Sequence, residues 1–211
     1  MVVRAAIVVA HPDDETIWAG GLILSKRDWE WEVFTLCRAG DTDRAPKFYQ
    51  ALKKLNATGR MDDMDDGPAQ IPLDESMVKD SVLGFLRETD YDILITHNPS
   101  GEYTRHIRHE EVSKAVIELW HKRAIIASEL WTFAYEDEDG NKYPAAMKSA
   151  NLCIHLPPDL RREKNRIITG IYGFPANSFE ANAAADSEAF WQFKHHDKAM
   201  QWLEKGGKNN N

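Results

Sequence analysis

Nearly continuous apolar runs alternate along this chain with segments whose apolar positions recur every three or four residues. Residues 2–10 read VVRAAIVVA and residues 91–96 read YDILIT, and both runs are rich in β-branched residues. Such runs are typical of strands that are buried on both faces of a parallel sheet. Residues 16–26, which follow the first run, have helical spacing instead. The pattern therefore predicts strands and helices in alternation.

The same reading assigns an element to most of the chain. We expect further strands at 32–37, 125–133 and 151–156, helices at 45–55, 73–88, 109–122, 158–171 and 187–205, and a loop at 56–67. Alternating strands and helices favour an α/β fold, which we predict to be a Rossmann-like three-layer sandwich with a mainly parallel central sheet. Residues 1–205 should form a single domain, and the low-complexity residues 206–211 a disordered tail.

This fold would gather the candidate chemistry at one edge of the sheet. Right-handed crossovers bring the loops after parallel strands to the same edge, and ligands bind there, outside the carboxyl ends of the strands. The loops after the predicted strands include residues 11–15, 38–44 and 97–109. We therefore expect the functional groups in these three segments.

The segment AHPDDE at residues 10–15 directly follows the first predicted strand. Histidine and aspartate suit a borderline cation such as zinc, and a catalytic zinc site uses about three protein ligands and keeps one position for water. His11 and Asp14 are the candidate metal ligands, and Asp13 is the candidate general base. The alternative is that Pro12 and the aspartates only start a helix at its positive end.

A second motif, HIRH at residues 106–109, lies beyond the YDILIT strand at the start of a predicted helix. It supplies the third ligand that the first motif lacks, and we assign that ligand to His109. His106 would then stabilise the oxyanion as an imidazolium and later protonate the leaving amine. Spacing alone leaves the reverse assignment open.

AHPDDE, the later GEY at residues 101–103 and the HxxH element together resemble the LmbE-like deacetylase family, which includes N-acetylglucosaminyl-phosphatidylinositol de-N-acetylases. The resemblance is firm over residues 2–26 and 91–116. It implies one zinc ion per chain, with ferrous iron as the alternative. The implied ligands are His11, Asp14 and His109, with Asp13 as the base and His106 as the electrostatic catalyst.

Arg44 echoes an arginine of the same family and is a candidate contact to a substrate hydroxyl or phosphate. The alternative is an exposed residue at a helix start. The chain also departs from the family pattern, because one residue is inserted between GEY and His106.

Composition excludes several classes of protein. The 34 acidic residues exceed the 26 basic ones, so the net charge of −8 disfavours binding to nucleic acid or to an anionic membrane. We find no stretch near the roughly 20 apolar residues that span a bilayer and no secretory signal, so we expect a cytoplasmic protein. The two cysteines form no disulfide framework. A monomer and a homo-oligomer both remain open.

These observations predict a zinc-dependent N-deacetylase that acts on a small acetylated amino sugar of the N-acetylglucosamine type or on a conjugate of one. The first alternative is a hydrolase of another amide that uses the same metal site. The second is a catalytically silent sugar- or metal-binding member of the family, and the residue inserted before His106 is its main support.

Overall fold

The computed structural model describes residues 2–102, 104–136, 143–184 and 186–207. The strands of its main sheet are β1 (Arg4–Val9), β2 (Glu30–Cys37), β3 (Thr58–Met64), β4 (Asp90–Thr96), β5 (Ile126–Phe133), β8 (Leu152–His155) and β9 (Ser187–Phe193). Within the described residues they form a seven-stranded sheet in the order β3-β2-β1-β4-β5-β9-β8. Strands β1 to β5 pair in parallel, whereas β9 and β8 are antiparallel. The predicted α/β fold with a mainly parallel sheet is confirmed.

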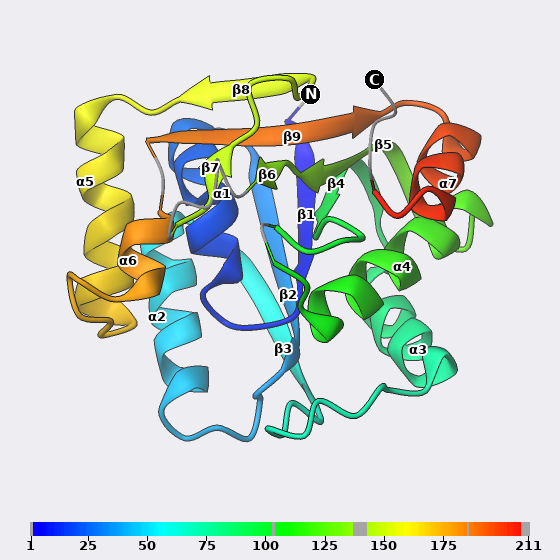
Figure 1. Cartoon of the computed structure of the whole chain (residues 1–211), viewed down its shortest axis with the longest axis horizontal. Coiled ribbons are helices and arrows are strands. Elements are labelled where there is room, and N and C mark those ends of the chain that lie inside the picture. The colour runs from blue at the N-terminus through cyan, green and yellow to red at the C-terminus, as the bar shows by residue number, and fades with distance from the viewer. Residues whose placement is uncertain (1, 103, 137–142, 185, 208–211) are drawn as a thin grey trace.

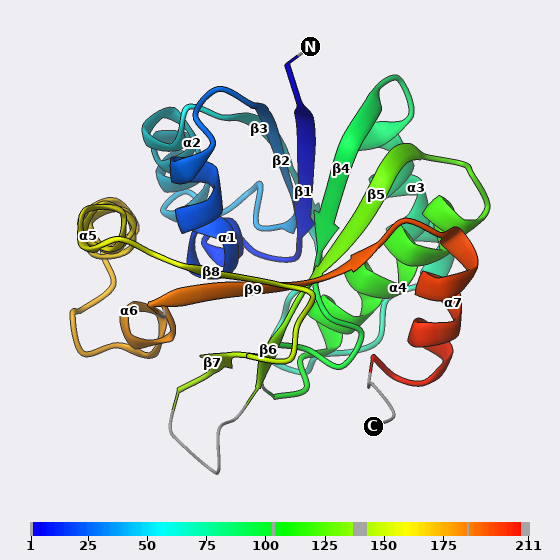
Figure 2. The same cartoon turned by 90° about the horizontal axis from the view of Figure 1, so that it is seen from above.

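Helices cover both faces of the sheet. One face carries α1 (Asp14–Ser25), α2 (Arg44–Leu55), α5 (Pro158–Arg166) with its π-helical extension η2 (Ile167–Ile171), and α6 (Phe179–Ala183). The other carries α3 (Glu75–Leu86), α4 (Ile107–His121) and α7 (His196–Glu204). Figures 1 and 2 show the two helical layers from perpendicular directions. A short hairpin of β6 (Tyr135–Glu136) and β7 (Ala145–Ala146) stands apart from the main sheet.

The apolar run of β1 is explained by its central place in this sandwich. Alternate side chains of a strand point to opposite faces of the sheet. Ile7 and Val9 accordingly pack into the core under α1 and α2, while Ala6 and Val8 pack into the core under α3 and α4. All four side chains are fully buried.

The prediction of a loop over residues 56–67 was wrong, because residues 58–64 form strand β3. This strand reads TGRMDDM, is partly exposed along its length and lies at the edge of the sheet beside β2. Its polar composition suits an edge strand, since only one side pairs with a neighbour and charged residues protect the other. Its polarity therefore hid the strand from a search for apolar runs.

The prediction of one helix over residues 187–205 was also wrong. Residues 187–193 form β9, and the helix α7 begins only at His196. Strand β9 lies between β5 and β8 with four consecutive buried residues, Glu188 to Trp191. A strand buried on both faces lacks the alternation that marks a half-buried strand, and aromatic spacing alone does not separate it from a helix.

The single domain over residues 1–205 remains our interpretation of this arrangement. Gly206 and Gly207 close α7 through backbone hydrogen bonds to Leu203 and Trp202. Residues 208–211 of the expected tail lie outside the described residues. Among the described helices, none combines the length and the apolar character that a membrane span requires.

Candidate metal centre and active site

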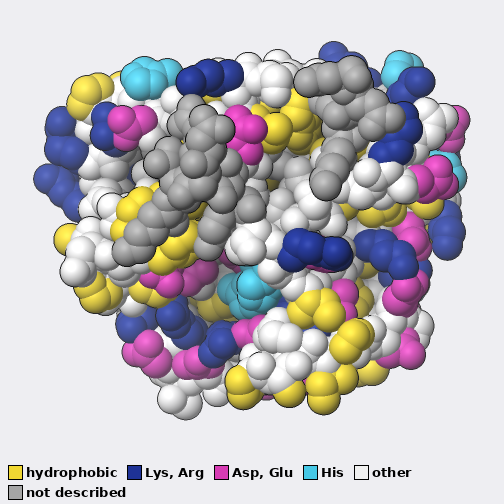
Figure 3. Space-filling model, in the orientation of Figure 1, with side chains coloured by type: hydrophobic (Ala, Val, Ile, Leu, Met, Phe, Trp, Pro, Cys, Tyr) yellow, Lys and Arg dark blue, Asp and Glu magenta, His cyan; other side chains and the backbone are white. Residues whose placement is uncertain are grey.

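The candidate site lies where the connections of the sheet diverge. Strand β1 pairs with β2 on one side and with β4 on the other, so the crevice between β1 and β4 is the topological switch point. His11 follows β1, and His97 directly follows β4. Figure 3 shows histidine side chains in a hollow near the middle of the face that is turned to the viewer, with acidic and basic groups around them.

The structure brings together most of the residues that the sequence singled out. One pocket is lined by His11, Pro12, Asp13, Asp14, Ile17, Trp18, Arg38, Arg44, Asp66, Glu102, Thr104, His106, His109, Phe179 and Glu180. All six residues predicted for metal binding, catalysis or substrate contact are in this set. They come from loops and from the first turns of helices that are far apart in sequence, and they meet at the carboxyl ends of the parallel strands.

The three predicted metal ligands converge on one point. His11 Nδ1 lies 3.2 Å from His109 Nε2 and 3.2 Å from Asp14 Oδ2, and the last two atoms are 3.5 Å apart. Zinc bonds of about 2.0–2.1 Å in tetrahedral geometry separate neighbouring ligand atoms by about 3.3–3.4 Å. The triangle of donor atoms therefore has the size that a zinc-like cation requires.

Surrounding carboxylates set the tautomer of each histidine ligand. Glu102 Oε2 lies 2.5 Å from His109 Nδ1, and Asp66 Oδ1 lies 3.3 Å from His11 Nε2. An ionised carboxylate only accepts hydrogen bonds, so these two ring nitrogens carry the protons. Trp18 Nε1 donates to the outer oxygen of Asp14 at 3.1 Å. Metal ligands are commonly held by outer partners of this kind.

The donor set fits a cation because it is poorly satisfied without one. With the outer nitrogens protonated, the lone pairs of His11 Nδ1 and His109 Nε2 face each other at 3.2 Å, next to a carboxylate oxygen. Burial lowers the pKa of His11, but Asp14 and Asp66 raise it overall to about 10. The site thus holds positive charge near neutral pH, either as a proton or as a metal ion.

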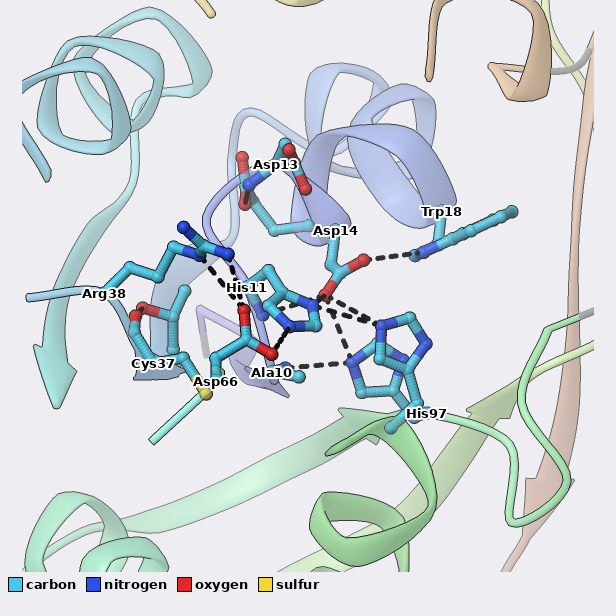
Figure 4. Close-up of polar contacts among 12 residues, drawn as sticks. Ala10, His11, Asp13, Asp14, Trp18, Cys37, Arg38, Asp66 and His97 are labelled. Carbon is cyan, nitrogen blue, oxygen red and sulfur yellow. Dashed lines mark hydrogen bonds and ion pairs between the residues drawn. The ribbon is translucent and has the colours of Figure 1, made fainter. Parts of the chain in front are cut away.

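Two other groupings of potential ligands occur in the described part of the chain. Asp14, His97 and His109 bring donor atoms within 4.8 Å of one another, and so do His11, His106 and His109. Both ring nitrogens of His97 are already used, because Nε2 accepts from Ala10 N–H at 2.9 Å and Nδ1 contacts Glu102 at 2.7 Å. His97 therefore supports the site from behind, and Figure 4 shows Asp14 between it and His11.

The adjacent carboxyl groups of Asp13 and Asp14 have pKa values shifted in opposite directions. Burial raises the pKa of Asp13 well above its usual range, and the charge of Asp14 adds to this rise. Burial also acts to raise the pKa of Asp14, but His109 and His97 outweigh it and hold that pKa well below its usual range. Environments that separate two neighbouring pKa values in this way assign different roles to the two groups. Asp14 stays ionised, whereas Asp13 is able to take up a proton.

The backbone at Asp13 is strained. Its φ of 122° is a conformation that L-residues rarely adopt, and such strain persists only where the surroundings enforce it. Glu15, fully buried, accepts from Asp13 N–H at 3.0 Å, and the hydroxyls of Thr16 and Tyr172 donate to its other oxygen. Glu15 thus holds the turn that presents Asp13.

Arg44 lies in the pocket but already has partners there. Its Nη1 donates to Asp13 Oδ2 at 3.0 Å, and its guanidinium lies 4.5 Å from the ring centroid of Phe174. Arg44 therefore orients the side chain of Asp13. Contact between Arg44 and a substrate remains a prediction.

His106 lies beside the ligand histidines in a different electrostatic state from the expected one. Its ring stacks on His109 with centroids 4.4 Å apart, and its Nδ1 is buried with no hydrogen-bond partner. Burial and the neighbouring His109 and His11 lower the pKa of His106 to about 4. A pKa this low favours a neutral ring, and the catalytic role expected for His106 stays a prediction.

The sequence of this chain matches one family model and one known relative. The PIG-L family model, described as GlcNAc-PI de-N-acetylase, matches residues 6–120, which is more than half of the chain. An uncharacterized protein of Acanthamoeba polyphaga mimivirus, L374, is 25% identical over 156 residues, which cover 67% of this chain and 66% of that protein. The match therefore spans slightly less than two thirds of the relative's own length.

Solved structures share the fold at low sequence identity. The N,N'-diacetylchitobiose deacetylase from Pyrococcus horikoshii matches with a TM-score of 0.67 at 15% identity, over 90% of this chain and 84% of that chain. GalB, the 4-carboxy-2-hydroxymuconate hydratase from Pseudomonas putida KT2440, matches with a TM-score of 0.60 at 14% identity, over 90% and 96%. These likenesses establish the fold alone. The match of the family model establishes more, and this chain belongs to the PIG-L, or LmbE-like, family.

Proposed function

We propose that this chain is a metal-dependent N-deacetylase that hydrolyses the acetamido group of an amino sugar or of a conjugate of one. The observation that carries the proposal is the convergence of His11 Nδ1, Asp14 Oδ2 and His109 Nε2 within 3.5 Å of one another, in a pocket that also contains Asp13. The deacetylase from Pyrococcus horikoshii, one of several deacetylases among the matched structures, supports the reaction class. It acts on a diacetylated disaccharide, which supports an acetylated sugar as the substrate.

The chain's own residues divide the chemistry between them. A divalent cation on the three ligands, zinc or ferrous iron, would supply Lewis acidity for the acetyl carbonyl and lower the pKa of a water molecule. Asp13, with its raised pKa, takes the proton of the attacking water. Arg44 keeps the Asp13 carboxylate oriented during this step.

The remaining steps break the amide bond. A neutral His106 donates one N–H to the developing oxyanion, because its low pKa keeps it uncharged. The carbon–nitrogen bond then breaks, and the proton held by Asp13 passes to the leaving nitrogen. Acetate and a free amine result.

Replacement of the base tests this division. Asp13→Asn should lower kcat at least about 100-fold while metal content is unchanged, because general-base catalysis contributes about 10²–10⁴-fold. Acetate and amine release from N-acetylglucosamine and N,N'-diacetylchitobiose is the measurement. Asp28→Asn, an exposed change near the end of α1, is the matched control.

Two results would contradict the proposal at different points. Full turnover by Asp13→Asn would remove Asp13 as the base. Metal-loaded wild-type protein that releases no acetate from either compound would exclude these sugar substrates. If a panel of other amides were also inert, a silent binding protein would be the better description.

A hydratase is the second candidate reaction. GalB has the same fold, and its name describes the addition of water to its substrate. A cation with a neighbouring carboxylate base serves that reaction as well. Acetate release distinguishes the two candidates, because addition of water to a double bond releases no acid.

A further inference from the structure

The short helix α6 forms part of the pocket wall from outside the family-matched region. Phe179 and Glu180, at its start, line the same pocket as His11 and Asp13. The hydroxyl of Ser178 accepts a hydrogen bond from Ala181 N–H at 3.2 Å and fixes the first turn. Residues 6–120 match the family model, so this wall belongs to the part of the chain that the family model does not cover.

Glu180 differs from the other acidic residues of the pocket. Each of the others has a charged or hydrogen-bonding partner: Asp13 has Arg44, Asp14 has Trp18 and the histidines, Asp66 has Arg38, and Glu102 has His97 and His109. The carboxylate of Glu180 has no hydrogen bond or ion pair to any residue in the described part of the chain, although Glu180 is partly buried. It is therefore an acceptor that remains free for a ligand.

The net charge of the pocket also favours a ligand without negative charge near Glu180. Five carboxylates line it, against the two guanidinium groups of Arg38 and Arg44, and both guanidinium groups already pair with aspartates. With a divalent cation bound and the histidines neutral, one negative charge remains. A free carboxylate attracts an ammonium group, accepts from hydroxyls and repels a phosphate.

We propose that Glu180 is a specificity-determining residue that selects acetamido sugars presenting hydroxyl or ammonium groups and excludes those with a phosphate near the acetamide. This inference rests on the proposed deacetylase function. It narrows the substrate class to neutral or cationic amino sugars, such as an oligosaccharide that already carries one free amine.

Three probes of graded charge test the proposal. These are N-acetylglucosamine, N-acetylglucosamine 6-phosphate and the disaccharide of glucosamine linked to N-acetylglucosamine. Wild-type protein should have the highest kcat/KM on the amine-bearing disaccharide and the lowest on the phosphate. We compare kcat/KM on the amine-bearing disaccharide with kcat/KM on N-acetylglucosamine 6-phosphate. Glu180→Lys should lower the ratio of the first to the second by about tenfold or more, because a hydrogen bond or ion pair to a charged group has a free energy of this size.

Separate values of KM and kcat, together with a matched control variant, show whether Glu180 acts through substrate binding. The shift should appear mainly in KM, because Glu180 is assigned to substrate binding. Glu180→Gln should give an intermediate ratio. Glu204→Lys makes the same charge change at an exposed site on α7 and should leave the ratio unchanged.

The outcomes separate this inference from the proposed function. If Glu180→Lys and wild-type protein had the same charge preference, Glu180 would not be the selector. If wild-type protein turned over none of the probes, the deacetylase proposal would fail on these substrates. Calorimetry would then measure the affinities of metal-loaded protein for glucosamine and glucosamine 6-phosphate, and these decide whether Glu180 selects by charge. Tighter binding of glucosamine that Glu180→Lys reverses supports the selector, and equal or absent binding overturns it.

Discussion

At the candidate metal centre, a single carboxylate contacts two histidines. Glu102 is fully enclosed and lies 2.7 Å from His97 Nδ1 and 2.5 Å from His109 Nδ1. Burial acts to raise its pKa, but the interactions with His97 and His109 lower that pKa to about 2, so it stays an acceptor. It thereby leaves His109 Nε2 available to bind a cation.

Glu102→Gln should therefore weaken zinc binding about 10- to 100-fold, the usual effect of losing such an outer partner. The amide cannot accept from both imidazoles, so one histidine must change tautomer or lose a hydrogen bond. Competition with a chelating dye measures the affinity. Glu110→Gln on α4 is the control, because within the described part of the chain the Glu110 carboxylate contacts Arg105, which precedes the helix, and neither histidine. Equal zinc affinity in wild type and Glu102→Gln would contradict this role.

How much of the site the sequence could predict depended on distance along the chain. His11, Asp13 and Asp14 lie within one turn, so their grouping was visible directly. The role of Glu102 was missed, although the GEY motif contains it, because its partners meet it only in the folded loop. Its signal was Gly101, whose φ of 78° turns the chain where a Cβ would lie 2.2 Å from Thr104 O.

Partners that come from different strand ends could not be predicted. Asp66 lies in the segment that was predicted as a loop, and no local signal showed that it would contact His11 and Arg38. Arg44 was expected to face the substrate, and it bonds Asp13 across 31 positions of sequence. Such pairings depend on how neighbouring loops pack, which no local pattern encodes.

At the scale of elements, the sequence predicted the buried parallel strands and the edge strand β8, but missed β3 at the other edge and β9 next to β8. Strands β1 and β4 are apolar because both of their faces are covered. Strand β3 is held largely by backbone pairing with β2, so its side chains remain polar. Register and packing, which act between elements, define β3 and β9.

Gly59 tests this account of β3. A Cβ at this position would lie 2.0 Å from Val33 O on β2, so Gly59→Ala must push the two backbones apart. We expect a loss of about 1–3 kcal/mol in the free energy of unfolding. Gly84→Ala, on the exposed face of α3 with nothing within 4 Å, should stabilise by up to about 1 kcal/mol. Urea denaturation of both variants and of wild-type protein is the measurement. A Gly59→Ala variant as stable as wild type would contradict the close approach of β3 to β2 at this position.

At the scale of the whole molecule, the C-terminal third folds back onto the helix that carries the site. Glu188 on β9 accepts from the backbone N–H groups of Gly21 and Leu22 in α1, each at 2.7 Å. Lys164 on α5 completes this buried cluster with an ion pair to Glu188 at 2.7 Å. Helix α1, which begins at Asp14, is thus held by two later elements.

Lys164→Met should destabilise the protein by about 3 kcal/mol or more, because it leaves the carboxylate of Glu188 buried without its counter-charge. Lys198→Met on α7, for which the described structure gives no ion pair, is the control. Thermal and urea unfolding check the change. A loss below about 1 kcal/mol would show that the ion pair does not hold α1 in place.

Locating the metal tests the central claim most directly. Crystals grown with zinc should show, in an anomalous difference map across the zinc absorption edge, one strong peak per chain. We predict that this peak lies within bonding distance of His11 Nδ1, Asp14 Oδ2 and His109 Nε2. A peak elsewhere, or no peak at these three atoms in zinc-loaded protein, would contradict the account.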